Sequence, residues 1–324
     1  MTGPASPATA RPPPSIPQKT GIPFPRMVAL AGRSPTNWAK RAELSPYPKR
    51  LGWGINHPDS RDLSRAACEP AMTAVKTPAP RIVLILQARM GSTRLPGKSM
   101  MDLAGAPLLA RILERVKRAK KPHAVVMATT QRPEDDVLVK LAEGMGVPVF
   151  RGSQDDLLDR YYQAAKAHDA DIVLRLPADN ATPEPAEIDR IVDFHLSTDF
   201  VFTTNLAQAC ASGYPDGIGA EAVDFWALEE VWKTRHDAER NEHPHLNFYN
   251  YARQEQVNPR YPVGAPQCPP DIARPDVVLD VNTQKQYDFI KSLYEYLYPR
   301  NPTFTIRDTI AWYDTIHKKQ EATA

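Results

Sequence analysis

The sequence predicts an α/β fold in which a mixed, mostly parallel sheet carries helices on both faces. Two observations support this prediction. Short runs rich in β-branched and other apolar residues recur from residue 81 onward, and segments with apolar residues at helical spacing lie between them. Continuous apolar strands that alternate with helices are typical of a parallel sheet, because the crossover helices bury both of its faces.

The strands are expected, in chain order, at 81–87, 124–130, 147–150, 171–176 and 199–204. The helix expected over 108–118 is the clearest, because Leu109, Ile112, Leu113 and Val116 repeat at helical spacing with the charges on the other face. Further helices are expected at 134–143, 155–167, 185–195 and 223–234, and two late ones at about 283–298 and 305–318. Ligands of an open α/β sheet bind outside the carboxyl ends of the strands, so the loops after residues 87, 130, 176 and 204 are the ones to inspect.

The first 80 residues differ from the rest in composition. They hold 15 of the 33 prolines, and proline at that density disfavours helices and strands alike. We expect residues 1–78 to be a disordered extension, or an extension that is absent because translation starts at Met72, or a functional tail. Residues 79–320 are expected to form one catalytic domain.

Charge and hydropathy exclude several classes of protein. Residues 1–80 carry a formal charge of +7 and the whole chain +2, so the remainder carries −5, which argues against a nucleic-acid-binding surface. No apolar run approaches the roughly 20 residues of a membrane helix, and no secretory signal is visible. The three scattered cysteines, Cys68, Cys210 and Cys268, predict neither a disulfide framework nor a zinc site. We therefore expect a cytoplasmic protein, with a homodimer left open.

The loop at 87–98, QARMGSTRLPGK, is the strongest functional signal. Arg89, Arg94 and Lys98 place three cations directly after a buried strand, and Gly91 and Gly97 let the backbone approach a ligand closely. Arginine forks and a lysine ammonium match phosphate oxygens, and a following helix would add its N-terminal dipole. The loop therefore predicts a site for a pyrophosphate or triphosphate.

Two better-known phosphate motifs do not fit this loop. Gly91 to Ser99 looks like the ATP-binding P-loop, but five residues separate the glycines where that loop has four, and Pro96 lacks an N–H. No G-x-G-x-x-G dinucleotide fingerprint is present.

The segment QARMGSTRLPGK resembles the entry motif of the cytidylyltransferase superfamily, which includes acylneuraminate and 3-deoxy-manno-octulosonate cytidylyltransferases. VFRGSQDDLLDRYYQAA (149–165) and GYPDGIGAEAVDFWALE (213–229) resemble its spore-coat polysaccharide biosynthesis protein F branch. The resemblance covers most of residues 81–316. It implies the Rossmann-like sheet of the nucleotide-diphospho-sugar transferase type and the transfer of a cytidylyl group from CTP to a sugar, with Mg²⁺.

The resemblance also implies roles for individual residues. Arg89 and Lys98 match cations that bind the nucleotide phosphates, with Gly91, Ser92 and Arg94 in the same loop. Ala88 matches the position whose backbone meets the cytosine ring. Arg89, Lys98 and Asp179 are the expected catalytic residues.

Asp179 is the expected metal ligand. It follows a predicted strand, and a carboxylate at that edge could hold Mg²⁺ alongside substrate phosphate, although Asp-Asn-Ala-Thr also suits a turn. Asn282 falls where the resemblance implies a second metal aspartate. Asp280 would project from the same face of a strand as Asn282 and could replace it.

The resemblance places acceptor-binding residues at Asp216, Glu221, Glu242 and His243. Gly219 stands where an aspartate is usual. Glu242, His243 and His245 could be mistaken for a metal cluster, but Pro244 argues against a shared helical face.

Two alternatives to a Mg²⁺-dependent nucleotidyltransferase stay open. One is a glycosyltransferase that uses a sugar nucleotide, although its usual Asp-x-Asp has a counterpart here only at Asp169 to Asp171, before the strand. The other is a sugar or nucleotide binder without activity. Neither the sugar nor the base is identified by side chains, so the expected partners are a nucleoside triphosphate and a small sugar, with no nucleic acid and no membrane.

Overall fold

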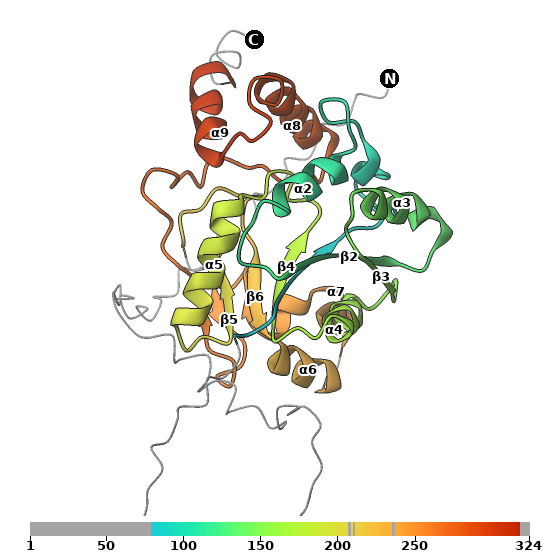
Figure 1. Ribbon diagram of the computed structural model, residues 1–324. Coiled ribbons are helices and arrows are strands. Elements are labelled where there is room, and N and C mark those ends of the chain that lie inside the picture. The colour runs from blue at the N-terminus through green and yellow to red at the C-terminus, as the bar shows by residue number, and fades with distance from the viewer. Residues whose placement is uncertain (1–78, 207–208, 210, 235–236, 318–324) are drawn as a thin grey trace, which may run out of the picture. The chain divides into compact units, whose positions relative to one another are not determined.

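The computed structural model describes residues 79–206, 209, 211–234 and 237–317. The expectations for residues 1–78, including Cys68, and for Cys210 therefore lie outside the described residues. Within these ranges, α-helices alternate along the chain with the strands of one large sheet (Figure 1).

The large sheet of the described part has seven strands in the order β3-β2-β1-β4-β6-β5-β9. Strands β3, β2, β1 and β4 are parallel neighbours, β6 is antiparallel to both β4 and β5, and β9 is parallel to β5. The prediction of a mixed, mostly parallel sheet is therefore confirmed. The strands are β1 (Ile82–Gln87), β2 (Ala124–Thr130), β3 (Val149–Gly152), β4 (Ile172–Pro177), β5 (Phe202–Thr204), β6 (Glu221–Asp224) and β9 (Val263–Gly264), with a separate pair β7 (Tyr249–Asn250) and β8 (Glu255–Gln256).

The helices follow the predicted segments closely. They are α2 (Leu108–Val116), α3 (Asp136–Gly144), α4 (Leu157–Ala167), α5 (Pro185–Ser197), α6 (Phe225–Thr234), α7 (Ala238–Glu242), α8 (Gln284–Leu297) and α9 (Ile306–Trp312), with short 3₁₀ turns η1 (Lys98–Met100), η2 (Pro133–Asp135) and η3 (Pro244–Asn247) and a π-helical turn over Tyr313–His317. Among the described helices, none combines the length and the apolar character needed to cross a membrane.

The predicted start of the helix at 223–234 is wrong. Val223 and Asp224 belong to β6, where Val223 pairs with Val173 of β4, and α6 begins only at Phe225. Short apolar stretches suit strand and helix equally, so only the partner strand decides between them.

Two apolar cores cover the two faces of the sheet, and β1 contributes to both. Leu84 and Leu86 pack into the core that also contains α2, α5, α8 and α9, whereas Val83 and Ile85 pack into the core with α4 and α6. Alternate side chains of a strand point to opposite faces, so a continuous apolar strand needs a layer on each side. Figure 1 shows α4, α6 and α7 together on one side of the sheet.

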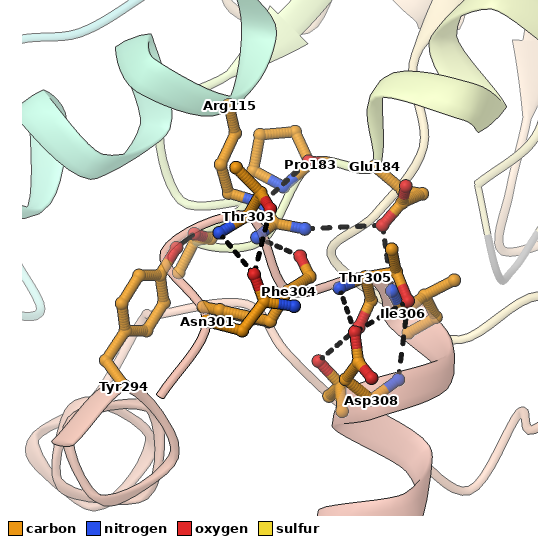
Figure 2. A network of polar contacts seen from close by, with 12 residues as sticks. Arg115, Pro183, Glu184, Tyr294, Asn301, Thr303, Phe304, Thr305, Ile306 and Asp308 are labelled. Carbon is orange, nitrogen blue, oxygen red and sulfur yellow. Dashed lines mark hydrogen bonds and ion pairs between the residues drawn. The ribbon is translucent and has the colours of Figure 1, made fainter. Parts of the chain in front are cut away.

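A buried polar network ties the C-terminal helices to the segment that follows β4 (Figure 2). Arg115 of α2 donates through Nε to the main-chain oxygen of Pro183 at 2.9 Å and pairs with Glu184 at 3.3 Å. The same Glu184 carboxylate accepts from the N–H of Ile306 at 2.8 Å, where α9 begins behind a capping box of Thr305 and Asp308. This network holds Pro183 and Glu184 in place, shortly after Asp179 in the chain.

Candidate active site

The loop after β1 is closed on itself through Met90. The main-chain oxygen of Met90 accepts from the N–H groups of Ser92 at 2.9 Å and Gly97 at 3.2 Å. Gly97 has a φ of +71°, which a glycine adopts without the steric cost of a side chain. The chain then enters η1 at Lys98. The helix expected at 108–118 is α2, which begins only at Leu108, so a single 3₁₀ turn and not an α-helix directly follows the loop.

Lys98 reaches from this loop to a distant part of the chain. Its Nζ donates to the main-chain oxygen of Val281 at 2.6 Å. Burial lowers the pKa of the Lys98 ammonium, although Asp179 and Asp280 raise it. Lys98 therefore lies half-buried beside two carboxylates.

Asp179 and Asp280 meet where β4 ends. Asn180 and Asp280 form an isolated antiparallel bridge, and the N–H of Val281 donates to the main-chain oxygen of Asp179 at 2.8 Å. Burial and then the charge of Asp179 raise the pKa of the Asp280 carboxyl. The Oδ1 atom of Asp179 is buried and accepts no hydrogen bond from any described residue. Two neighbouring carboxylates with an unsatisfied buried oxygen are what a bound cation would stabilise.

Asn282 lies beside these carboxylates with both ends of its amide occupied. Its Oδ1 accepts from Nη2 of Arg94 at 2.7 Å, and its Nδ2 donates to Oδ2 of Asp280. Gln286 of α8 donates to the other oxygen of Asp280 at 2.8 Å. The amides of Asn282 and Gln286 thus orient Asp280, and Asn282 ties Arg94 to the same cluster.

A polar cleft of about 410 Å³ opens beside this cluster. Arg89 and Arg94 of the loop line it together with Asp179, and Glu242 and His243 line it from the end of α7. Nη2 of Arg89 lies 3.8 Å from Oε1 of Glu242, both partly exposed. The remaining lining residues are Gln87, Gln154, Asp155, Leu157, Arg160, Arg175 and Pro177.

The structure brings most of the residues named from the sequence to this edge of the sheet. Ala88 is buried at the start of the loop, with its N–H bonded to the main-chain oxygen of Ala128 at 3.2 Å. The Oγ of Ser92 accepts from the N–H of Leu95 at 3.3 Å, and Gly91 lines an adjoining pocket. These positions are compatible with the predicted nucleotide contacts, which stay predictions.

Two predicted acceptor residues lie away from the cleft surface. Glu221 is 1% exposed; it pairs with Nε of Arg175 at 2.8 Å and accepts from the hydroxyl of Tyr251 at 2.6 Å. It therefore lies behind Arg175, which itself lines the cleft. Asp216 is half-buried, and its main chain bonds to Val277 and Leu279.

Packing explains why Gly219 carries no side chain. A Cβ atom at this position would lie 2.4 Å from the main-chain oxygen of Asn205, closer than such atoms approach one another. The aspartate implied by the resemblance therefore cannot be accommodated here unless residue 205 moves.

Arg175 and Arg160 are cleft residues that the sequence did not single out. Arg175 stands in the apolar strand IVLRLP, and a charged residue in a buried strand is the signal that could have identified it. Arg160 of α4 is 1% exposed and donates to the main-chain oxygens of Ser153 and Gln154, contacts that no signal in the sequence indicates.

The two rival metal motifs find no support in the part of the chain that the structure describes. In that part, no three or more His, Cys, Asp or Glu residues are grouped so that they could hold a metal. Glu242, His243 and His245 therefore do not form such a group. Asp171 accepts from the N–H of Arg81, where β1 begins, so the Asp169–Asp171 pair lies at the opposite end of the strands from the cleft.

Comparisons with known proteins identify one family. The family model described as Cytidylyltransferase matches residues 83–297. An uncharacterized protein of Methanocaldococcus jannaschii is 37% identical over 165 residues; the match covers 50% of this chain and 65% of that protein, just under two thirds of its length. The spore coat polysaccharide biosynthesis protein SpsF of Bacillus subtilis is 30% identical over 66% of this chain and 86% of its own. The 3-deoxy-manno-octulosonate cytidylyltransferase of a Bradyrhizobium species is 30% identical, and the match covers 54% of this chain and 74% of that protein.

A solved structure gives the same result. The structure of a cytidylyltransferase from Leptospira borgpetersenii is 29% identical in sequence, with a TM-score of 0.65 over 75% of this chain and 96% of that one.

Proposed function

The chain belongs to the cytidylyltransferase family, and from this premise we propose that it transfers the cytidylyl group of CTP to a hydroxyl of a sugar or sugar acid and releases pyrophosphate. One observation carries the proposal. The hydrogen bond from Lys98 to Val281 holds a loop with three cations against the carboxylates of Asp179 and Asp280. A triphosphate needs both: cations for its oxygens and carboxylates for the metal that accompanies it.

The cations of the loop have distinct positions for this task. Arg89 and Arg94 line the cleft as planar forks, and Lys98 lies deeper as a half-buried point charge. Arg94 is already oriented by its bond to Asn282, so little side-chain entropy is lost when it binds phosphate. These groups are proposed to bind the β- and γ-phosphates and to stabilise the negative charge of the departing pyrophosphate.

Asp179 and Asp280 fit a divalent cation, which we take to be Mg²⁺. The unsatisfied Oδ1 of Asp179 and the raised pKa of the Asp280 carboxyl are both expected of carboxylates that would hold a cation between them. A bound Mg²⁺ would neutralise phosphate charge in this site. Asn282 and Gln286 are proposed to hold Asp280 in orientation, as groups around metal ligands generally do.

The acceptor is proposed to enter the cleft from the side of Glu242 and His243. Its hydroxyl oxygen would attack the α-phosphorus in line and form a new P–O bond, the hydroxyl proton would pass to solvent, and the bond from the α-phosphorus to the oxygen that bridges to the β-phosphate would break, so that pyrophosphate leaves. Positioning and charge neutralisation dominate such transfers, so the chain needs no covalent intermediate. Glu221 is proposed to act through Arg175, which it holds at the cleft wall.

The names of two relatives support a sugar as acceptor. The Bacillus subtilis relative is named for polysaccharide biosynthesis, and the Bradyrhizobium relative for 3-deoxy-manno-octulosonate, a sugar acid. The polar cleft, with four arginines along it, suits an anionic acceptor.

The test is a screen of the four nucleoside triphosphates against neutral sugars and sugar acids with Mg²⁺, with pyrophosphate as the readout. We expect release only with CTP and only when an acceptor is present. Release of nucleoside diphosphate from a sugar nucleotide would identify a glycosyltransferase instead. Binding of CTP by calorimetry without release across the panel would identify a binding protein.

A further inference from the structure

Asp135, at the end of η2, makes contacts that its position in the chain does not predict. It directly precedes α3, where an aspartate usually caps its own helix, but its side chain makes no capping hydrogen bond. The residue is only 1% exposed. A buried carboxylate that does not cap its helix must have other partners, because burying an unsatisfied charge is costly.

Those partners lie on two other elements. Oδ1 of Asp135 accepts from the N–H of Met90 at 2.7 Å. Oδ2 accepts from the N–H of Thr130 at 3.2 Å and also from the Thr130 hydroxyl, where β2 ends. One carboxylate thus connects the loop after β1 to the end of β2.

Met90 is the residue through which the loop is closed. Its oxygen accepts from Ser92 and Gly97, so its N–H is the place where the loop can be fixed from outside. Arg89 and Gly91 are its neighbours in the chain. Together with Asp135 they line a pocket of about 180 Å³ that adjoins the cleft through Arg89.

Among the residues described by the structure, Asp135 forms no ion pair and interacts with the charge of Arg160 only at longer range, so N–H and O–H donors make its close contacts. Hydrogen bonds to an ionised acceptor are shorter and stronger than neutral ones, which fits the 2.7 Å contact to Met90. An apolar residue that filled the same space would leave the Met90 N–H without a partner.

We infer that Asp135 is a positioning residue for nucleotide binding: through the N–H of Met90 it fixes the backbone that carries Arg89 and Gly91. The role of Asp135 in catalysis rests on the proposed function. The fixation of Met90 by Asp135 is independent of that function and can be measured without any nucleotide.

The first measurement is hydrogen exchange at the Met90 amide in the full chain without ligand. Asp135→Ala should remove the protection of this amide. Asp135→Asn should retain most of it, because the amide oxygen can still accept from Met90; its NH₂ can donate to the Thr130 hydroxyl, and only the acceptor for the Thr130 N–H is lost. Leu138→Ala is the matched control, because it opens a cavity in the core under α3 and leaves the carboxylate of Asp135 and the N–H of Met90 in place. It should lower the melting temperature and leave the Met90 amide protected.

The second measurement separates KM from stability. Asp135→Ala should raise the KM for CTP by up to about 100-fold, because a displacement of about 1 Å can have an effect of that size. Asp135→Asn should restore KM to within a few-fold of the parent value, and Leu138→Ala should leave it unchanged. If Asp135→Ala does not fold, Asp135→Ser takes its place, because its hydroxyl is too short to reach Met90.

Each outcome bears on the inference. Unchanged exchange at Met90 in Asp135→Ala, or a KM for CTP that rises equally in Leu138→Ala, would overturn it. Lost protection with an unaltered KM would limit Asp135 to a structural role. If the parent protein releases no pyrophosphate, the proposed function fails, while the exchange result still decides whether Asp135 fixes Met90.

Discussion

The Nζ atom of Lys98 donates a hydrogen bond of 2.6 Å to the main-chain oxygen of Val281, across 183 residues of sequence. The N–H of Val281 in turn donates to the main-chain oxygen of Asp179 at 2.8 Å. One residue of the late chain therefore joins the cationic loop after β1 to the carboxylate after β4. The expectations below follow from that junction and from the buried network behind it.

Lys98→Ala should lower turnover by about 10²–10³-fold, because removing one preorganised charge from a site of this kind typically has that effect. The fold should persist, since the change removes a single side chain at the edge of the sheet. Pyrophosphate release, with a thermal melt in parallel, measures both. Lys117→Ala is the matched control: Lys117 also donates to a main-chain oxygen, that of Met145, but on the exposed side of α2. Undiminished turnover in Lys98→Ala would refute the assignment of the loop.

Asp179→Asn and Asp280→Asn should each raise the Mg²⁺ concentration for half-maximal activity by at least about 10-fold, since each removes a charged ligand. Asn282→Ala should raise it less, because the Asn282 amide is engaged by Arg94 and Asp280. A Mg²⁺ titration of pyrophosphate release decides the order. If Asn282→Ala proves the more damaging variant, Asn282 and not Asp280 is the second ligand.

Arg115→Met should lower the free energy of unfolding by about 3–5 kcal/mol, because it leaves the charge of Glu184 buried without the arginine that pairs with it. Both side chains are at most 7% exposed, so water cannot replace the lost charge. Chemical denaturation measures the change. Arg253→Met is the matched control, because its ion pair with Glu255 is exposed and should contribute less than about 1 kcal/mol. Equal losses in the two variants would contradict the role given to burial.

His245 should make the fold sensitive to acid. Burial and the neighbouring Arg175 lower the pKa of His245 to about 3, against about 6.5 for an unperturbed histidine. Between these values the unfolded chain binds a proton that the folded chain does not, so stability falls as pH falls below about 6.5. The loss from this group is about 1.4 kcal/mol per pH unit at most.

The variant His245→Gln should flatten this dependence, because its amide oxygen can accept from Arg175 without a titrating proton. Denaturation at pH 7 and pH 5 tests it, and His243→Gln, which removes an exposed histidine nearby, serves as the control. An unchanged slope in His245→Gln would show that other groups account for the acid sensitivity.

Much of the sheet could be predicted, because local patterns decide it. Buried parallel strands such as 82–87 need apolar residues on both faces, and this requirement is visible in the sequence. The strand at Glu221–Asp224 could not be predicted from its four residues, since its partner on β4 determines that it pairs. The two-residue strand β9 could not be predicted for the same reason, because its partner β5 is distant in sequence.

The candidate site divides in the same way. The sequence alone points to the loop cations Arg89, Arg94 and Lys98, because three cations and two glycines after a strand form a local pattern. Arg175 and Asp135 became visible only in the structure. A single charged residue in a strand, or one aspartate before a helix, has its role set by contacts with segments that are distant in the chain.

By itself, the sequence determined the α/β class, the cationic loop proposed to bind phosphate and the candidate carboxylate Asp179, because each depends on residues close together in the chain. Only the tertiary structure decided that Asp280 faces Asp179, that Asn282 holds Arg94, and that Glu221 lies behind Arg175. The reason is physical. The direction of a side chain and the charge it meets depend on which strands and loops pack together, and packing is settled by the whole chain at once.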